Sequence, residues 1–314
     1  MKPVFILLFT AAVACGQSAL RGPVAGHIFD SRNGTIRPVL GIPGSAHVGA
    51  PLPGPALAWA FPAPGGNFAF AGTAAAPGDV LLLLDLNEQE PVAKEVARLT
   101  EAPRRVAFGS SGDCAVLGGA PGSAVLTVSG IAQAPIVTTA TLPAGADEIS
   151  AIATDARCSK VVVASEGRLY RSAVAGDPLT ELVTLGAVSG VVLDGEGRAA
   201  FVAALDLRQI VRVDDVFGEA RLSVLAGGSD GVTRPAGLAL VDSLLLVADA
   251  GARTLFTFNA QLSELRRAEP LGFEPNRCEL INRDGTVVLT GGGGPPLWVI
   301  DSRAGGLIAF IPFE

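Results

Sequence analysis

The sequence predicts an all-β protein made of repeated four-stranded antiparallel sheets, and three observations support this. The chain of 314 residues holds 39 Gly and 22 Pro, which interrupt helices and favour many short strands. Short apolar runs alternate with turns rich in Gly, Asp and Ser. These turns return at a nearly constant spacing. A regular series of small sheets, none able to bury both faces alone, is typical of a β-propeller whose blades stack around one axis.

The amino terminus, residues 1–14, resembles a secretory signal peptide. One cation, Lys2, precedes an apolar run that is too short to span a bilayer, and small residues follow it. Two interpretations stay open: cleavage after Ala14, or lipidation of Cys15. The sequence AVAC resembles a bacterial lipobox that has Ala in place of the usual Leu. Either interpretation predicts export to the periplasm, the cell envelope or the exterior, with residues 15–25 as a short linker.

Residues 26–314 are expected to form a single propeller domain. Its first segment, 26–47, predicts a hairpin that belongs to a closing blade. The stretch His27–Arg32 ends in Asp-Ser-Arg, as does Val299–Arg303 near the carboxyl terminus, which predicts that the hairpin is the outer half of a blade. Strands from both termini often close such a ring because closure removes exposed edges. Seven blades, one of them incomplete, are favoured over six blades with an accessory hairpin.

Six further units follow, each with two apolar runs around a turn. Their turn landmarks are spaced by 46, 46, 39, 46 and 42 residues, and one four-stranded blade needs roughly 40–45 residues. The landmarks are Gly66, Gly112, Cys158, Gly197, Ser243 and Gly285. Small residues at the start of the predicted innermost strands suit crowding near the axis. Residues 90–102 fit a strand or a short helix equally well.

One unit carries a more specific pattern. Residues 233–258 contain Pro-x-Gly-Leu-Ala from Pro235, then Val-Ala-Asp ending at Asp249, then Gly251-x-Arg253. This unit resembles an NHL-type blade, and the chain as a whole resembles bacterial, exported NHL/YVTN-like propellers. The resemblance implies the propeller fold and a habit of binding, in a family that includes receptors, scaffolds and a few hydrolases.

Polar residues cluster where the predicted innermost strands begin. In a closed ring these positions meet at one mouth of the central channel, where several guanidinium groups would attract a carboxylate or phosphate. The competing interpretation is that they pair with Glu148 and Glu274 or only solvate the rim. The predicted ligand-binding residues are Arg104, Arg105, Glu148, Arg234, Asn276 and Arg277.

No catalytic residue, resident metal or cofactor is predicted. The only histidines, His27 and His47, have no partners at metal-ligand spacing, and Asp-Gly pairs such as Asp194-Gly195 are typical of hairpin turns. The leading hypothesis is an exported, non-enzymatic binding or scaffold module. The alternative is a hydrolase of the lactonase or lyase type, whose metal at the channel mouth would need Glu148 and Asn276 as ligands.

Charge and cysteine content limit the partners. The formal net charge of −7 disfavours nucleic acid, and a membrane is expected only through a lipid on Cys15. The expected partner is an unidentified protein or a small anionic ligand. Cys114, Cys158 and Cys278 allow three disulfide pairings that the sequence does not distinguish, or three buried thiols.

Overall fold

The structure is a computed structural model that describes residues 23–42, 44–75, 80–87, 90–119, 124–146, 148–290, 297–302 and 306–312. The predicted signal peptide, most of the predicted linker and Cys15 lie outside these residues. The described residues form 27 strands and one 3-10 turn, η1 (Gly228–Asp230). Among them, no helix is long and apolar enough to cross a membrane.

The strands form seven sheets, which we number as blades 1 to 7 in chain order. Blade 1 has three strands and the others have four. The strands of blades 1 to 3 are β1 (Val24–Asp30), β2 (Thr35–Leu40), β3 (His47–Val48); β4 (Leu57–Pro62), β5 (Phe68–Thr73), β6 (Val80–Asp85), β7 (Val92–Arg98); and β8 (Arg105–Phe108), β9 (Cys114–Gly118), β10 (Ala124–Ser129), β11 (Ile136–Thr141).

The remaining blades repeat the same antiparallel meander. Their strands are β12 (Ile149–Thr154), β13 (Val161–Ser165), β14 (Arg168–Ser172), β15 (Thr180–Thr184); β16 (Val188–Leu193), β17 (Ala199–Ala204), β18 (Gln209–Asp214), β19 (Arg221–Ala226); β20 (Pro235–Val241), β21 (Leu244–Asp249), β22 (Thr254–Asn259), β23 (Glu264–Pro270); and β24 (Glu279–Leu280), β25 (Thr286–Val288), β26 (Leu297–Asp301), β27 (Leu307–Ile311). Residues 92–98, left open between helix and strand, form β7.

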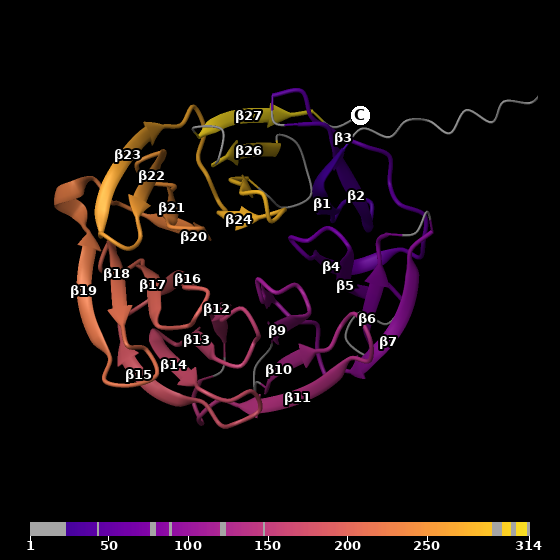
Figure 1. Cartoon of the computed structure of the whole chain (residues 1–314), viewed down its shortest axis with the longest axis horizontal. Helices are drawn as coiled ribbons and strands as arrows, with labels where there is room; N and C mark the ends of the chain where they lie inside the picture. The colour runs from indigo at the N-terminus through magenta and orange to yellow at the C-terminus, as the bar shows by residue number, and fades with distance from the viewer. Residues whose placement is uncertain are drawn as a thin grey trace, which may run out of the picture.

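The seven sheets stand around a common axis, with the first strand of each blade inside and the last on the rim (Figure 1). The prediction of a β-propeller with seven blades, one of them incomplete, is confirmed. The second strands β9, β13 and β17 are buried at every residue, whereas the rim strand β23 is mostly exposed. The cores therefore lie between blades. Phe201 of blade 5, for example, shares a core with Leu245 of blade 6, and burying each such side chain contributes about 1.5–3 kcal/mol.

The turn between the first two strands has one form in blades 2, 3, 4, 5 and 7. Its first residue donates its N–H to the carbonyl of the residue five positions later, as Asp194 does to Ala199 (2.9 Å). The fourth residue in blades 2 to 5, and the fifth in blade 7, has a positive φ, a conformation that glycine adopts at least cost. These residues are the predicted landmarks Gly66, Gly112, Cys158, Gly197 and Gly285. The turn in blade 6 is shorter and has its positive φ at Asp242.

The position of the amino-terminal hairpin differs from the prediction. We expected the outer half of a blade, but β1 lies nearest the axis, with β2 and β3 outside it (Figure 1). The Nδ2 atom of Asn282, in the innermost turn of blade 7, donates to the carbonyl of Ala25 (2.8 Å). The carboxyl terminus adds to the outside instead: the N–H of Val48 in β3 donates to the carbonyl of Pro312 (3.0 Å). Strands from both ends of the chain therefore close the ring.

Two of the cysteines join neighbouring blades. Cys114 at the start of β9 forms a disulfide with Cys158 in the first turn of blade 4. Cys278 is free and buried, and its Sγ donates to the carbonyl of Leu246 (3.7 Å). Burial raises the pKa of this thiol to about 12, so it stays protonated and unreactive at neutral pH.

Candidate functional site: the mouth of the channel

The predicted ligand-binding residues lie where the innermost strands begin, at one end of the ring that we call the channel mouth. The starts of adjacent innermost strands touch each other. Arg105 donates from Nε to the carbonyl of Ser150 in the next blade (2.7 Å), and the hydroxyl of Ser189 donates to the carbonyl of Pro235. The ring therefore brings these segments from distant parts of the sequence to a common rim.

Arg105 and Arg277 occupy a position that is held by small residues in blades 1, 4, 5 and 6 and by Trp59 in blade 2. Each lies four residues before the first residue of its blade's turn, where blades 5 and 6 have Gly190 and Gly237. A Cβ at Gly237 would lie 2.8 Å from the backbone nitrogen of Cys278 in the next blade, which explains the glycine there. The long arginine side chains at this position are accommodated at the rim, where both residues are exposed.

The arginines of the mouth are paired with carboxylates. Arg104 Nη1 lies 3.0 Å from Glu148 Oε1, across the interface between blades 3 and 4. Arg277 Nη1 lies 3.3 Å from Glu279 Oε2, two residues further along the same chain segment. Each of these arginine side chains keeps about half of its surface exposed (53% and 46%). The pairing reduces the positive potential but leaves exposed guanidinium surface for a ligand.

Arg234 pairs with Glu274, and a buried carboxylate fixes the segment before it. Asp249 at the end of β21 is fully buried. It accepts hydrogen bonds from the N–H groups of Thr233 (2.7 Å), Arg234 and Ala252 (2.7 Å) and from the Thr233 hydroxyl (2.7 Å). Charge-assisted bonds of this number hold the loop rigidly. Asp249 therefore acts as an acceptor for backbone amides.

Asn276 and Arg277 share one backbone acceptor. The N–H groups of both donate to the carbonyl of Leu289 (3.1 and 3.2 Å). The pairing between the first two strands of blade 7 therefore continues for a few residues before the start of β24. Among the residues that the structure describes, no three His, Cys, Asp or Glu side chains gather in a way that could hold a metal ion. Glu274, which the sequence analysis named as a possible partner of the arginines, pairs with Arg234. Glu279 was missed, although the Arg277-x-Glu279 spacing places both side chains on one face of a strand.

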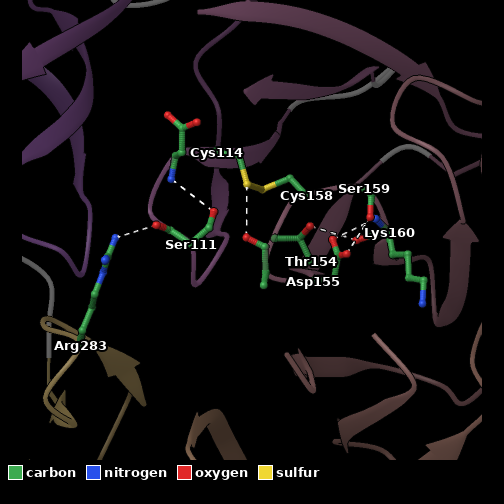
Figure 2. Close-up of a disulfide and its surroundings, with 10 residues drawn as sticks. Ser111, Cys114, Thr154, Asp155, Cys158, Ser159, Lys160 and Arg283 are labelled. Carbon is green, nitrogen blue, oxygen red and sulfur yellow. Dashed lines mark hydrogen bonds between the residues drawn. A yellow bond between two sulfur atoms is a disulfide. The ribbon is translucent and has the colours of Figure 1, made fainter. Parts of the chain in front are cut away.

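The opposite end of the ring is formed by the turns between first and second strands. Backbone hydrogen bonds join successive turns, from the Ser111 N–H to the carbonyl of Ala156 (3.1 Å) and from the Ala156 N–H to the carbonyl of Gly195 (3.2 Å). Arg283 of blade 7 reaches the carbonyl of Ser111 in blade 3 (3.2 Å; Figure 2). A Cβ at Gly112 would lie 1.3 Å from the Nη2 of Arg283, so only glycine admits this contact.

The carboxylates of two acidic turns cap the backbone of their own turns. Asp194 accepts the N–H groups of Arg198 (2.6 Å) and Ala199 (3.2 Å), and Asp155 accepts the N–H of Lys160 (3.0 Å). The prediction of ordinary hairpin-turn chemistry is confirmed for these residues. The Gly-rich stretch 291–296 lies outside the described residues.

Comparison with known proteins identifies the fold. No model of a protein family matches the chain, and no curated protein matches its sequence. Solved structures do match. Hydrazine synthase of Kuenenia stuttgartiensis superposes with a TM-score of 0.62 at 10% identity, over 94% of this chain and 98% of that one. A functionally unknown protein of Desulfotomaculum acetoxidans gives 0.64 at 15% identity, over 92% and 99%.

A third solved structure resembles the chain less closely. The β-propeller domain of Cps50 (Swd1) from Myceliophteria thermophila gives a TM-score of 0.56 at 13% identity, over 86% of this chain and 93% of that one. At such low identities the likeness concerns the fold alone. The chain is similar to these proteins in its fold, which in this chain is a β-propeller of seven blades.

Proposed function

We propose that this protein is an exported, NHL/YVTN-like propeller that acts without catalysis, binding a protein or a small anionic ligand at the channel mouth. The observation that carries the proposal is the convergence of Arg104, Arg105, Arg234 and Arg277 on one rim. Guanidinium groups present planar arrays of donors that match carboxylate and phosphate oxygens. Those of Arg104, Arg234 and Arg277 are about half exposed.

Two features support export. The Cys114–Cys158 disulfide suits an oxidising compartment, because cytosolic reductants keep most thiols reduced. The amino-terminal sequence has the order of a signal peptide, with a cation, an apolar run and small residues. The net charge of −7 makes nucleic acid an unfavourable partner, and contact with a membrane would depend on a lipid at Cys15.

The hydrolase alternative meets an electrostatic obstacle at the same rim. Its metal would need Glu148, but that carboxylate is paired with Arg104 at 3.0 Å. Asn276, its second ligand, is followed directly by Arg277. Nearby guanidinium groups repel a cation. Stoichiometric calcium or zinc in the purified protein would favour the hydrolase over the binding module.

The test is calorimetric titration with citrate, succinate, acetate and inorganic phosphate at low salt. Binding of at least one anion should weaken about tenfold or more in Arg104→Gln and in Arg277→Gln, because each variant removes a charged donor. Arg98→Gln is the matched control, since Arg98 is an exposed arginine on the rim strand β7. Unchanged affinity in both mouth variants, or an equal loss in the control, would refute the mouth as the site.

A further inference from the structure

Arg171 joins blade 4 to blade 5 on the outer part of the ring. It lies on β14 and points across the interface to the turn between β18 and β19. Its Nη1 atom donates to the carbonyls of Val216 and Gly218, the latter at 2.9 Å. A single guanidinium group therefore holds the turn of the next blade by its backbone oxygens.

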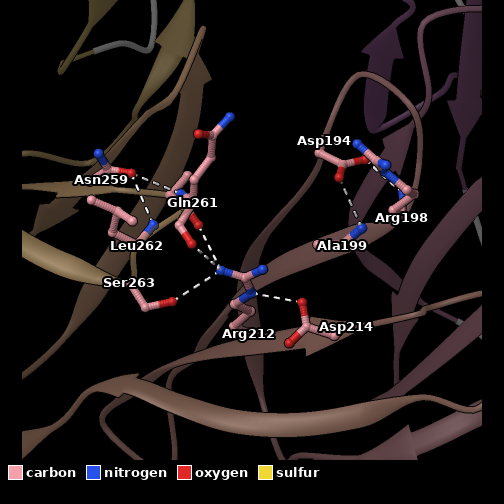
Figure 3. Close-up of polar contacts among 10 residues, drawn as sticks. Asp194, Arg198, Ala199, Arg212, Asp214, Asn259, Gln261, Leu262 and Ser263 are labelled. Carbon is pink, nitrogen blue, oxygen red and sulfur yellow. Dashed lines mark hydrogen bonds and ion pairs between the residues drawn. The ribbon is translucent and has the colours of Figure 1, made fainter.

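Arg212 does the same from blade 5 to blade 6 (Figure 3). Its Nη1 donates to the carbonyls of Ala260 (2.8 Å) and Gln261 (3.2 Å) and to the Ser263 hydroxyl (3.0 Å). Its Nε bonds to Oδ1 of Asp214, two residues further along β18 (2.8 Å). Arg171 and Arg212 occupy the same register position, so the same contact is made at two successive interfaces of the ring.

In blade 2 the same position holds a leucine. Leu83 pairs with Phe70 across β5 and β6, as Arg212 pairs with Phe201 across β17 and β18. Counting from the first turn of each blade gives the same correspondence. Leu83 has no donor, so blade 2 cannot hold the turn of blade 3 in the way that blade 5 holds blade 6.

The acidic partner of the arginine is nevertheless present in blade 2. Asp85 lies two residues after Leu83, where blade 5 has Asp214 after Arg212. Asp85 is exposed, and it accepts the backbone N–H and the side-chain amide of Asn87 on one oxygen, Oδ1 (2.9 Å each). A carboxylate has two acceptor oxygens, so Asp85 has capacity for a further donor.

The backbone acceptors are present as well. The turn of blade 3 has Ile131 and Gln133 where the turn of blade 5 has Val216 and Gly218, because Gln133 and Gly218 each close their turn on the residue three positions earlier (3.1 and 2.9 Å). The carbonyls of Val216 and Gly218 are those that Arg171 binds. Within the described part of the chain, the carbonyls of Ile131 and Gln133 accept no hydrogen bond.

A hollow lies between these groups, and we call it the blade 2–3 hollow. Its volume is about 690 Å³, and Gln133 lies on its wall. Its other lining residues are apolar Leu83, Val92 and Ile131 and charged Asp85, Glu90 and Lys94. The hollow therefore combines an apolar wall with a net negative charge.

We propose that the blade 2–3 hollow binds an arginine side chain from a partner protein. Its guanidinium group would take the place that Arg171 and Arg212 take elsewhere, with Asp85 and the carbonyls of Ile131 and Gln133 as acceptors. The apolar wall suits the methylene stem of arginine. An arginine within a polypeptide fits better than free arginine, whose carboxylate would be repelled by Asp85 and Glu90.

Lys94 limits the strength of this site. It lies directly opposite Leu83 on β7, so the two side chains share one face of the sheet. Blade 5 has uncharged Ser223 at this place, opposite Arg212. Lys94→Ser is therefore expected to strengthen binding of a cation, by about two- to threefold for an exposed charge.

The test is a titration of the whole, isotopically labelled protein with N-acetyl-arginine amide, followed by NMR. Saturable shifts are expected at the amides of 130–133 and 85. The citrulline counterpart has the same shape without the charge and should bind about tenfold more weakly. Asp85→Asn should weaken binding of the arginine probe by a similar factor, and Leu83→Arg should abolish it by filling the hollow.

Three results would overturn the proposal: no saturable shift at these amides, equal binding of the citrulline probe, or tighter binding of free arginine than of the blocked probe. The last would assign the hollow to a free amino acid. If Leu83→Arg does not fold, Asp85→Asn decides alone, because Asp85 is exposed and its change leaves the core intact. The hollow is separate from the channel mouth, so neither proposal depends on the other.

Discussion

Two interfaces of the ring, between blades 5 and 6 and between blades 2 and 3, have the same geometry and different chemistry. At the first, Arg212 lies over the Phe201 ring (5.8 Å to its centroid) and binds the backbone of the next blade. At the second, Leu83 stands opposite Phe70, which stacks on Phe108 of blade 3 (centroids 6.3 Å apart). The repeat thus preserves strand register while the side chains change, and an interface that relies on apolar packing leaves polar acceptors at its outer edge.

The interface between blades 3 and 4 shows a third solution, the disulfide, and removing it should have the largest effect on stability. The Cys114→Ala, Cys158→Gly double variant opens a loop with a sequence separation of 44 residues. The chain-entropy relation predicts a loss of about 4 kcal/mol in the free energy of unfolding. Urea unfolding followed by fluorescence measures it.

A matched variant separates the crosslink from the backbone at residue 158. Cys158 has a φ of 54°, in the conformation that glycine holds in the equivalent turns. Cys114→Ala, Cys158→Ala should therefore be less stable than the glycine variant by about 1 kcal/mol. Equal stability of the two double variants would show that the left-handed residue carries no strain.

Converting one interface into the other should have an intermediate effect. Arg212→Leu gives blade 5 the residue of blade 2 and removes bonds to two carbonyls, a hydroxyl and Asp214. Bonds to a charged group contribute about 1.5–3 kcal/mol, so a loss of about 2 kcal/mol in the free energy of unfolding is expected. Arg98→Leu on the exposed rim should change it by less than about 0.5 kcal/mol. A loss as small as that of the control would mean that the contact of Arg212 with the turn of blade 6 does not stabilise the fold.

The closing blade gives the smallest predicted effect, and it depends on pH. His27 on β1 is buried, and burial lowers its pKa below the ordinary value of 6.5. The unfolded chain then binds a proton more readily than the folded one. Stability should fall as the pH drops below about 6.5, by at most about 1.4 kcal/mol per pH unit.

Urea unfolding at pH 7.5 and 5.5 measures this dependence. His27→Phe should reduce the difference in the free energy of unfolding between the two pH values. A pH dependence that survives in His27→Phe would place its origin in another group.

The period of the fold was readable from the sequence because it is a local property. The landmark residues Gly66, Gly112, Gly197 and Gly285 needed a positive φ, and glycine marks that requirement. The distance of the first hairpin from the axis could not be predicted in this way, because it depends on contacts with other blades. The Asp-Ser-Arg pattern ends both β1 and β26, and it describes a strand that meets a turn at any distance from the axis.

The candidate site was predictable in part for the same reason. The first strands of all blades run in the same direction along the axis, so their starts lie at one end of the channel. Arg105 and Arg277, which lie at such starts, could therefore be placed at one rim. The disulfide partner of Cys114 and the contacts of Arg212 depend on how neighbouring blades meet, and no spacing within one blade encodes that. The blade 2–3 hollow could not be predicted from the sequence either. It is recognised only when equivalent strand positions in different blades are compared in the structure.

The contact between Arg283 of blade 7 and Ser111 of blade 3 affects access to the central channel. In a ring of seven, these blades stand nearly opposite each other, so this side chain reaches across the end of the channel where hydrogen bonds join the turns of blades 3, 4 and 5. Arg283 therefore narrows this end of the channel, and a ligand of the channel mouth approaches the axis from the opposite end.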